Sequence, residues 1–488
     1  MPRLSPIDQA FLLLETPQRP MNVGALVVLK PPPGARRRFA DRFISGMLER
    51  PVGPPFSYRL KPGPVRPLLR LEDDPRMDPA RQVRRHTLPR GSDLARLFRR
   101  VCEIHVELLP RDEPMWQAHV FTGLPGGRVA LYFKTHHGLI DGIGFIRIVT
   151  GLVSKSAAAA RARAIWEGLA AVPPVQQAQA GASGGTLELL RMADEARRTT
   201  SDLLRLVWHV GMRGLGFGHG LALPFVATPN VLKTAPSPNR VMAHCSVSLR
   251  RARGIAERSG AKINDVMLAA LDVAMSRYLE ERGCPPEQPL VADIPVALQD
   301  DGGAGNRITI LQVPMGRPGS EPAERLQQIY RETQEMKQEV RSLSGGSLML
   351  YSILEHSIAS TIESLRLGEL PMLANLVVSN PAGLDRRVYL NGAEVELALP
   401  VSVVAHHQVL NVTVTTYMDD LHVTFIALRE AIPDVGKLAA YTAEAVAEIE
   451  AGVAPAARRR ARPLRQATRA RKPARRTRRK SSGRTATR

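Results

Sequence analysis

Hydrophobic residues along this chain of 488 residues recur in short runs bounded by turn-forming residues, and longer stretches of mixed polarity separate the runs. In the first region, the apolar runs at 23–29 (VGALVVL) and 128–135 (RVALYFKT) are typical of buried strands. Residues 93–109 between them have the composition of a helix. This region is therefore predicted to combine strands with helices.

The same mixture returns in the second half of the chain. Two stretches, 265–281 and 323–343, have helical composition. Runs typical of strands interleave with them at 289–298, 307–315, 373–380, 410–418 and 421–428. Strands and helices mixed in both halves predict an α/β protein with two lobes of similar size. The length of the chain agrees with more than one packed unit.

Composition sets the boundaries between the predicted parts. Residues 156–185 are first rich in alanine and then read VPPVQQAQAGASGG, which is typical of a linker and not of a core. We therefore expect a first lobe at 1–155, a linker with a connecting helical segment at 156–239, a second lobe at 240–452 and a disordered tail rich in Arg and Lys at 453–488.

The formal charge of +21 is mostly a property of that tail. Residues 458–488 carry 15 Lys or Arg and no acid, so the rest of the chain carries only +6. A segment of this composition is not expected to fold. It would attract an anionic membrane or lipid-droplet surface, make non-specific contacts with nucleic-acid phosphates, or serve as a solvated tail, and the sequence leaves these alternatives open.

Three further features of the sequence bear on the cellular compartment in which the protein is expected. The three cysteines, Cys102, Cys245 and Cys284, are far apart and lack metal-type spacing, so a reducing cytosol is expected. The N-terminus has no basic segment followed by an uninterrupted apolar run, so no secretory signal is predicted. The stretch at 203–225 is too polar to be predicted as a membrane span, and would lie on an interface or pack as a helix within the protein.

The candidate chemistry directly follows the second apolar run, in HHGLIDG at 136–142. His136 and His137 are placed at the end of a strand, Asp141 lies near a turn that leads into a helix, and Gly142 supplies backbone freedom. Random placement predicts this pattern on the order of 10⁻³ times in such a chain. Adjacent side chains on a strand point to opposite faces, so only one histidine is expected to project into a site. This geometry disfavours a metal site.

A single histidine at such a strand end is suited to general-base catalysis. An ordinary pKa of about 6.5 leaves it mostly neutral in the cytosol and able to take a proton from a hydroxyl. Asp141 would receive the imidazole N–H or pair with an arginine to hold the loop, and both roles remain open. The motif contains no serine and is not part of a GxSxG elbow, so direct attack by a base-activated acceptor is expected.

These residues resemble the HHxxxDG motif of the bacterial wax ester synthase/diacylglycerol acyltransferase family, which belongs to the CoA-dependent acyltransferases. Residues 4–29 are similar to the N-terminal signature of that family, and 113–142 to its segment that runs into the active-site strand. KINDVMLAAL at 262–271 is similar to its Asn-Asp motif, and GNRITILQVPM at 305–315 to a Gly-Asn strand entry. The resemblance is collinear and extends to about residue 450.

The chain departs from the family pattern at three places. Met115 replaces the usual Leu of a Pro-Leu-Trp segment. VVSNPAGL at 377–384 lacks a Ser-Asn-Val-Pro-Gly-Pro pattern, and ADIPVALQDD at 292–301 lacks an arginine that commonly follows this strand. These differences concern the acceptor and donor pockets more than the chemistry.

The resemblance implies two chloramphenicol-acetyltransferase-like lobes with mixed sheets and helices, and an active site between the lobes. His137 would act as general base on the hydroxyl of a fatty alcohol or diacylglycerol, which attacks the thioester of a long-chain acyl-CoA. His136 would support the loop, Asp141 would orient it, and Gly142 would let the turn close. The reaction requires no covalent enzyme intermediate, metal or cofactor, because acyl-CoA is a co-substrate.

Three further sites have structural interpretations beside functional ones. Asn264 and Asp265 would cap a helix or would lie beside the acyl or CoA path. The second histidine pair, at 406–407, has no Asp-Gly after it and is interpreted as structural. Trp116 is interpreted as a core anchor near the active-site strand.

Two apolar substrates and a cytosolic enzyme imply peripheral association with the inner membrane or with lipid droplets. Two other functions remain open. One is a catalytically weak lipid-granule protein that tethers granules to DNA or to a membrane through the basic tail. The other is a condensation-type acyltransferase with a different acceptor.

Overall fold

The computed structural model describes the chain at residues 4, 6–61, 69–140, 142–158, 163–167, 232, 234–297, 308–342, 374–381, 383–406 and 408–453. Residues 1–453 cluster as one compact unit. The predicted tail lies outside the described residues except for Val453, and so does most of the predicted linker at 156–239.

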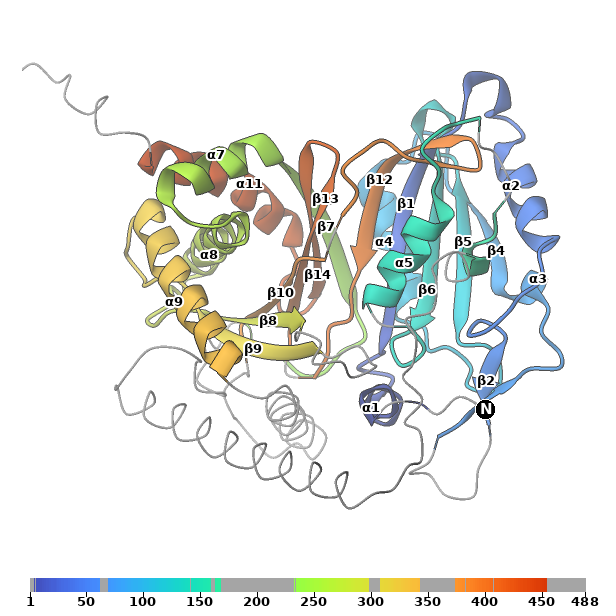
Figure 1. The fold of residues 1–488 in the computed structure, drawn as a ribbon, viewed down its shortest axis with the longest axis horizontal. Coiled ribbons are helices and arrows are strands. Elements are labelled where there is room, and N and C mark those ends of the chain that lie inside the picture. The colour runs from blue at the N-terminus through green and yellow to red at the C-terminus, as the bar shows by residue number, and fades with distance from the viewer. Residues whose placement is uncertain are drawn as a thin grey trace, which may run out of the picture. The chain divides into compact units, whose positions relative to one another are not determined.

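Six strands form the first sheet (Figure 1). In sheet order they are β11 (Tyr389–Leu390), β12 (Ala393–Val401), β1 (Asn22–Lys30), β6 (Val129–His136), β5 (Trp116–Thr122) and β4 (Val83–Thr87). Neighbours pair antiparallel except β4 and β5, which are parallel. The two strands predicted in the first region are thus confirmed as β1 and β6, in the centre of the sheet. Gly24 permits their close approach, because a Cβ there would lie 2.6 Å from the Phe133 oxygen.

Helices pack on both faces of the first sheet. The predicted helix at 93–109 is α4 (Leu94–His105), which begins where the Asp93 carboxylate accepts the Arg96 N–H at 2.9 Å. It lies between this sheet and β7 of the second sheet. On the other face, α2 (Phe39–Leu48) and α5 (Gly142–Leu152) contribute to a separate apolar core. The shorter elements are α1 (Pro6–Leu14), β2 (Tyr58–Leu60), β3 (Leu71–Asp73), α3 (Pro79–Gln82) and the 3₁₀ turns η1 (Pro33–Ala35), η2 (Pro125–Gly127) and η3 (Ile165–Glu167).

The second sheet also has six strands. Their order is β7 (Arg240–Ser248), β14 (Asp420–Leu428), β13 (Leu410–Tyr417), β10 (Leu376–Ser379), β8 (Val291–Ala297) and β9 (Ile308–Pro314). β10 runs parallel to both of its neighbours, and the other pairs are antiparallel. Helices α7 (Leu249–Ser259), α8 (Ile263–Glu281), α9 (Pro322–Ser342) and α11 (Val435–Gly452) lie together beside this sheet, around α8 (Figure 1). The five strands and two helices predicted for this region are confirmed, and so is the α/β class.

The two sheets do not divide at the predicted boundary near residue 240. Strands β11 and β12 come from the region assigned to the second lobe, yet β12 pairs with β1 from Gly24↔Val401 to Lys30↔Glu394. Apolar side chains alternate along β12, and one row of them is buried. The first sheet therefore includes two strands, β11 and β12, that follow most of the second-sheet strands in the sequence.

None of the helices described here is both long enough and apolar enough to cross a membrane. α8 is the most buried of the long helices, since almost every side chain from Asp265 to Leu279 is buried. Other helices and the second sheet surround it, so its apolar surface is used within the protein.

Candidate active site

The histidine pair lies where β6 ends and the chain turns toward α5. The His136 N–H donates to the Met115 oxygen at 3.0 Å, just before β5, and the His137 N–H donates to the Met21 oxygen at 2.8 Å, just before β1. Two neighbouring strand entries therefore hold the backbone of the pair. The structure places both histidines at a strand end, as the sequence predicts.

The His136 side chain is buried and turned back onto its own turn. Its Nδ1 accepts the Gly138 N–H at 3.0 Å. A ring nitrogen that accepts carries no proton, so the proton of the neutral ring is assigned to Nε2. That nitrogen lies 3.4 Å from Oε1 of Glu15.

Glu15 is a site residue that the sequence does not single out. Its side chain is 2% exposed, and Oε1 accepts the Met21 N–H at 3.0 Å. Arg111 approaches Oε2 at 3.4 Å. Burial would raise the pKa of this carboxyl, but the hydrogen bond and charge of His136, the Met21 N–H and Arg111 together hold it below its ordinary value. Glu15 is therefore an ionised carboxylate directly behind the histidine pair.

The His137 ring is partly buried and stacks on Phe11 of α1, with centroids 3.9 Å apart and planes at 24°. Burial and the nearby charge of His136 lower the pKa of His137 to about 4, although its own backbone carbonyl opposes the shift. The imidazole is consequently neutral at cytosolic pH. Its base role stays a prediction, and the ring has the protonation state which that role requires.

The structure describes the glycines of the motif but not its aspartate. Asp141 lies outside the described residues, so its role stays a prediction. Gly142 is the first residue of α5, where a turn enters the helix. Gly138 has a steric requirement, since a Cβ there would lie 2.7 Å from the Asp8 oxygen and 3.2 Å from Nδ1 of His136.

Asn264 and Asp265 lie at the start of α8. The Asp265 carboxylate is fully buried; it accepts the Lys262 N–H at 2.9 Å and the Thr333 hydroxyl of α9 at 2.7 Å. These contacts agree with the helix-capping interpretation of this residue. Asn264 is exposed, and its carboxamide oxygen accepts a hydrogen bond from the Asn380 side chain at the end of β10. That contact joins two of the segments on which the family resemblance rests.

Trp116 is a core residue, as its interpretation predicts. It is fully buried, and its Nε1 donates to the Phe56 oxygen at 2.8 Å. Its ring packs against Phe133 of the active-site strand and against Trp166. Met115, the departure from the family pattern, is also fully buried, so the exchange is one apolar residue for another in a packed position. Of the second histidine pair, His406 is buried and His407 lies outside the described residues.

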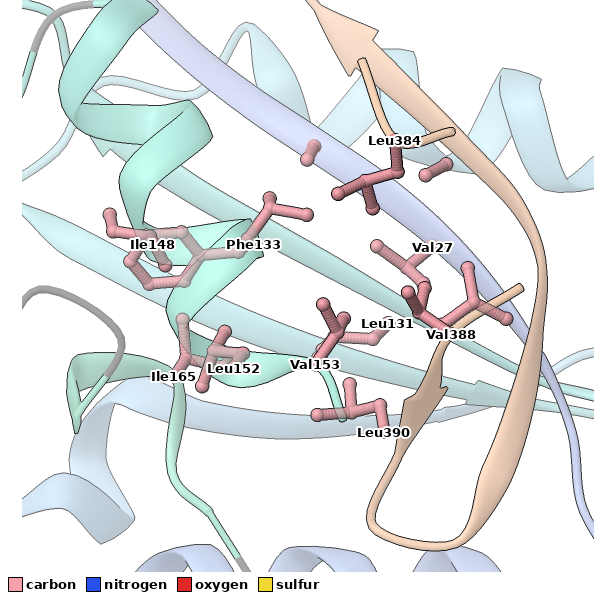
Figure 2. Close-up of a pocket in the computed structure, with 14 residues that line it drawn as sticks. Val27, Leu131, Phe133, Ile148, Leu152, Val153, Ile165, Leu384, Val388 and Leu390 are labelled. Carbon is pink, nitrogen blue, oxygen red and sulfur yellow. The ribbon is translucent and has the colours of Figure 1, made fainter. Parts of the chain in front are cut away.

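Figure 2 shows an apolar hollow beside the active-site strand. It has about 490 Å³ of empty space, part of it open to solvent. Val27 of β1, Leu131 and Phe133 of β6, and Ile148 and Leu152 of α5 point into it (Figure 2). The hollow thus lies on the α5 face of the first sheet, between the strand that precedes the motif and the helix that follows it.

Comparisons with known proteins agree over almost the whole unit. A profile described as the wax ester synthase/diacylglycerol acyltransferase catalytic domain matches residues 4–267, and one described as the C-terminal domain of the same enzymes matches residues 304–450. An O-acyltransferase of Acinetobacter baylyi is 29% identical over 92% of this chain and 97% of its own length. A putative diacylglycerol O-acyltransferase of Mycobacterium tuberculosis is 30% identical over 92% of this chain and 100% of its own.

Solved structures resemble the fold as well. The wax ester synthase/diacylglycerol acyltransferase of Marinobacter aquaeolei VT8 superposes with a TM-score of 0.70 at 26% identity, over 93% of this chain and 100% of that one. A starter condensation domain of rhizomide synthetase, solved with C8-CoA, reaches a TM-score of 0.52 at 15% identity, over 92% and 94% of the two chains. The second likeness concerns the fold alone.

Proposed function

This chain belongs to the wax ester synthase/diacylglycerol acyltransferase family, and we propose that it transfers a long-chain acyl group from acyl-CoA to the hydroxyl of a fatty alcohol, a diacylglycerol, or both. The observation that carries the reaction is the state of His137. Its ring is neutral and stacks on Phe11, and its backbone N–H donates to the Met21 oxygen just after the end of β6.

In the proposed reaction, His137 takes the proton of the acceptor hydroxyl as the oxygen attacks the thioester carbonyl. A tetrahedral oxyanion forms and then collapses, which breaks the carbon–sulfur bond. The CoA thiolate leaves and receives the proton from His137, so the products are the ester and free CoA. A thiol has a pKa of about 8.5, and a thiolate therefore leaves much more readily than an alkoxide. His136, Asp141 and Gly142 retain their proposed roles of supporting, orienting and closing the loop.

The acceptor is tested by offering purified protein labelled palmitoyl-CoA with hexadecanol, with dioleoylglycerol, or with no acceptor. Labelled wax ester or triacylglycerol above the sample without acceptor is the expected result, and the ratio of the two products assigns the acceptor. Release of CoA without either ester would contradict the proposal, because it would make the protein a thioesterase.

We also propose that residues 458–488 bring the enzyme to its apolar substrates, as a peripheral protein on the inner membrane or lipid droplets. Their 15 positive charges and lack of acids support attraction to anionic lipid at about 1 kcal/mol per residue near the surface. Deleting 458–488 should reduce binding to vesicles that contain anionic lipid and leave the turnover of soluble short-chain substrates unchanged. Equal vesicle binding by both proteins, with DNA binding lost on deletion, would assign the tail to nucleic acid instead.

A further inference from the structure

A buried carboxylate lies beside one histidine of the motif and is linked to the other through a single residue, Met21. We propose that Glu15 is a positioning residue for acyl transfer, which fixes the ring of His136 and the backbone of His137. This inference rests on the proposed function of His137 as the base. Glu15 precedes the pair by more than a hundred residues, so the sequence alone does not place it beside them.

Glu15 acts on His137 through Met21. The Met21 N–H donates to Oε1 of Glu15 at 3.0 Å, and the Met21 oxygen accepts the His137 N–H at 2.8 Å. Both backbone polar groups of Met21 are thus engaged, because its N–H donates to Glu15 and its oxygen accepts the backbone N–H of His137. Displacement of the carboxylate frees Met21 and with it the backbone anchor of His137.

Glu15 acts on His136 through the proton on Nε2. The Gly138 N–H occupies Nδ1, so the ring proton is assigned to Nε2, which lies 3.4 Å from Oε1 of Glu15. A carboxylate only accepts, so it matches both the Met21 N–H and this ring N–H. Both contacts are made by Oε1. A glutamine that keeps its oxygen there places its donating NH₂ at the position of Oε2, where it faces the Arg111 guanidinium, which also donates. The Glu15→Gln change therefore alters the pattern of donors with almost no change in volume.

The first helix is part of the same arrangement. Arg111 donates to the Leu12 oxygen at 2.7 Å while it approaches Oε2 of Glu15, and Phe11 one residue earlier stacks on His137. The end of α1 is therefore tied to the carboxylate and to the ring of the base at once. A shift of Glu15 would also move the aromatic surface that supports this ring.

The experiment compares full-length wild type with Glu15→Gln in the palmitoyl-CoA assay across pH. We expect kcat to fall roughly 10- to 100-fold, as small displacements of reacting groups commonly cause, with the KM for acyl-CoA within about twofold of wild type. The matched control is Asp272→Asn, which removes another buried carboxylate far along the chain, on α8. It should leave kcat and the pH profile of the folded protein unchanged.

Two outcomes overturn the inference. One is wild-type kcat in folded Glu15→Gln. The other is an equal loss in Glu15→Gln and Asp272→Asn that follows thermal stability, which would make Glu15 only structural. If wild type forms no ester, or His137→Ala is as active as wild type, the proposed function fails and not the role of Glu15 alone.

A second measurement needs no folded Glu15 variant. Ring ¹⁵N shifts of histidine-labelled wild type, with His136→Asn to assign the signal, report which nitrogen of His136 carries the proton. We expect the proton on Nε2, facing the carboxylate. A neutral ring protonated on Nδ1 would overturn the inference, because Glu15 would then face a lone pair.

Discussion

The first sheet and the helices beside the second sheet bury ionisable groups in different ways, although the second sheet itself also holds a pair of histidines, His244 and His422, whose pKa values burial lowers. Around the first sheet, His105, His119 and His137 are neutral bases whose pKa values burial lowers to about 3, 2 and 4. Among the helices of the second sheet, Asp272 and Arg325 form a buried ion pair at 3.0 Å. Burial raises the pKa of Asp272 to about 6, although Arg325 opposes the shift.

The difference indicates which region is built for proton transfer. An ion pair fixes two charges against each other, and here it joins α8 to α9. A histidine buried in a packed sheet stays neutral and keeps a lone pair on its ring, because burial of the protonated ring would cost free energy. A ring with a free lone pair is what a general base requires. The motif lies beside the neutral bases of the first sheet, whereas the ion pair lies between helices that pack beside the second sheet.

The largest expected effect is acid sensitivity that originates in the first sheet. A histidine whose native pKa is lowered contributes stability above its unfolded pKa of about 6.5, and this stability is lost as pH falls toward the native value. For each proton that the unfolded chain binds and the folded chain does not, the free energy of unfolding falls by about 1.4 kcal/mol per unit decrease in pH. Because an unfolded histidine is half protonated at pH 6.5, His105, His119 and His137 together should lower the free energy of unfolding by about 5 kcal/mol between pH 6.5 and pH 5.

Urea unfolding at the two pH values measures this change. Asp272 works in the reverse direction, because its raised native pKa makes the folded state take up a proton before the unfolded state does. Asp272→Asn should therefore show a steeper loss than wild type over the same interval. A free energy of unfolding that does not fall on acidification would contradict the picture of buried neutral bases.

The next effect belongs to the ion pair itself. Asp272→Asn leaves the Arg325 guanidinium buried without its carboxylate, and breaking such a pair commonly costs about 3–5 kcal/mol. We expect this loss in the free energy of unfolding at neutral pH, with kcat of the folded protein unchanged. A fall in kcat without a fall in stability would instead connect α8 to the chemistry.

The smallest expected effect is a steric one inside the motif. A Cβ at position 138 would lie 2.7 Å from the Asp8 oxygen, so Gly138→Ala must displace the turn or α1. We expect kcat to fall roughly 10- to 100-fold, because the turn carries both histidines. Gly53→Ala is the matched control, since a Cβ at Gly53 meets nothing within 4 Å. Equal kinetics for the two variants would show that the turn tolerates displacement.

Local patterns were sufficient to predict the strands and helices whose own sequences are strongly apolar or amphipathic. The runs that became β1 and β6 carry the signal within themselves, and so does the motif at the end of β6. β12 has a clear alternation of apolar residues, so its existence was open to prediction. Its place beside β1 was not, because pairing between segments that far apart depends on the packing of the whole sheet.

The site was predictable only as far as it is continuous in sequence. His136, His137 and Gly142 occur together, whereas Glu15 reaches His136 only after β1 has paired with β6. An acidic residue shortly before the Pro-Met-Asn-Val-Gly stretch is the one local signal, and nothing in its neighbours indicates a histidine partner. Asp265 shows the reverse case, because its position at a helix start already predicts the cap that the structure contains.

The most direct test of the account is the acyl-transfer rate of His137→Ala in purified, folded protein, with labelled palmitoyl-CoA and hexadecanol. Removal of a general base should slow ester formation by about 10²–10⁴-fold, and acyl-CoA binding should persist. Ester formation at close to the wild-type rate would contradict the account, because the proton would then be removed without His137.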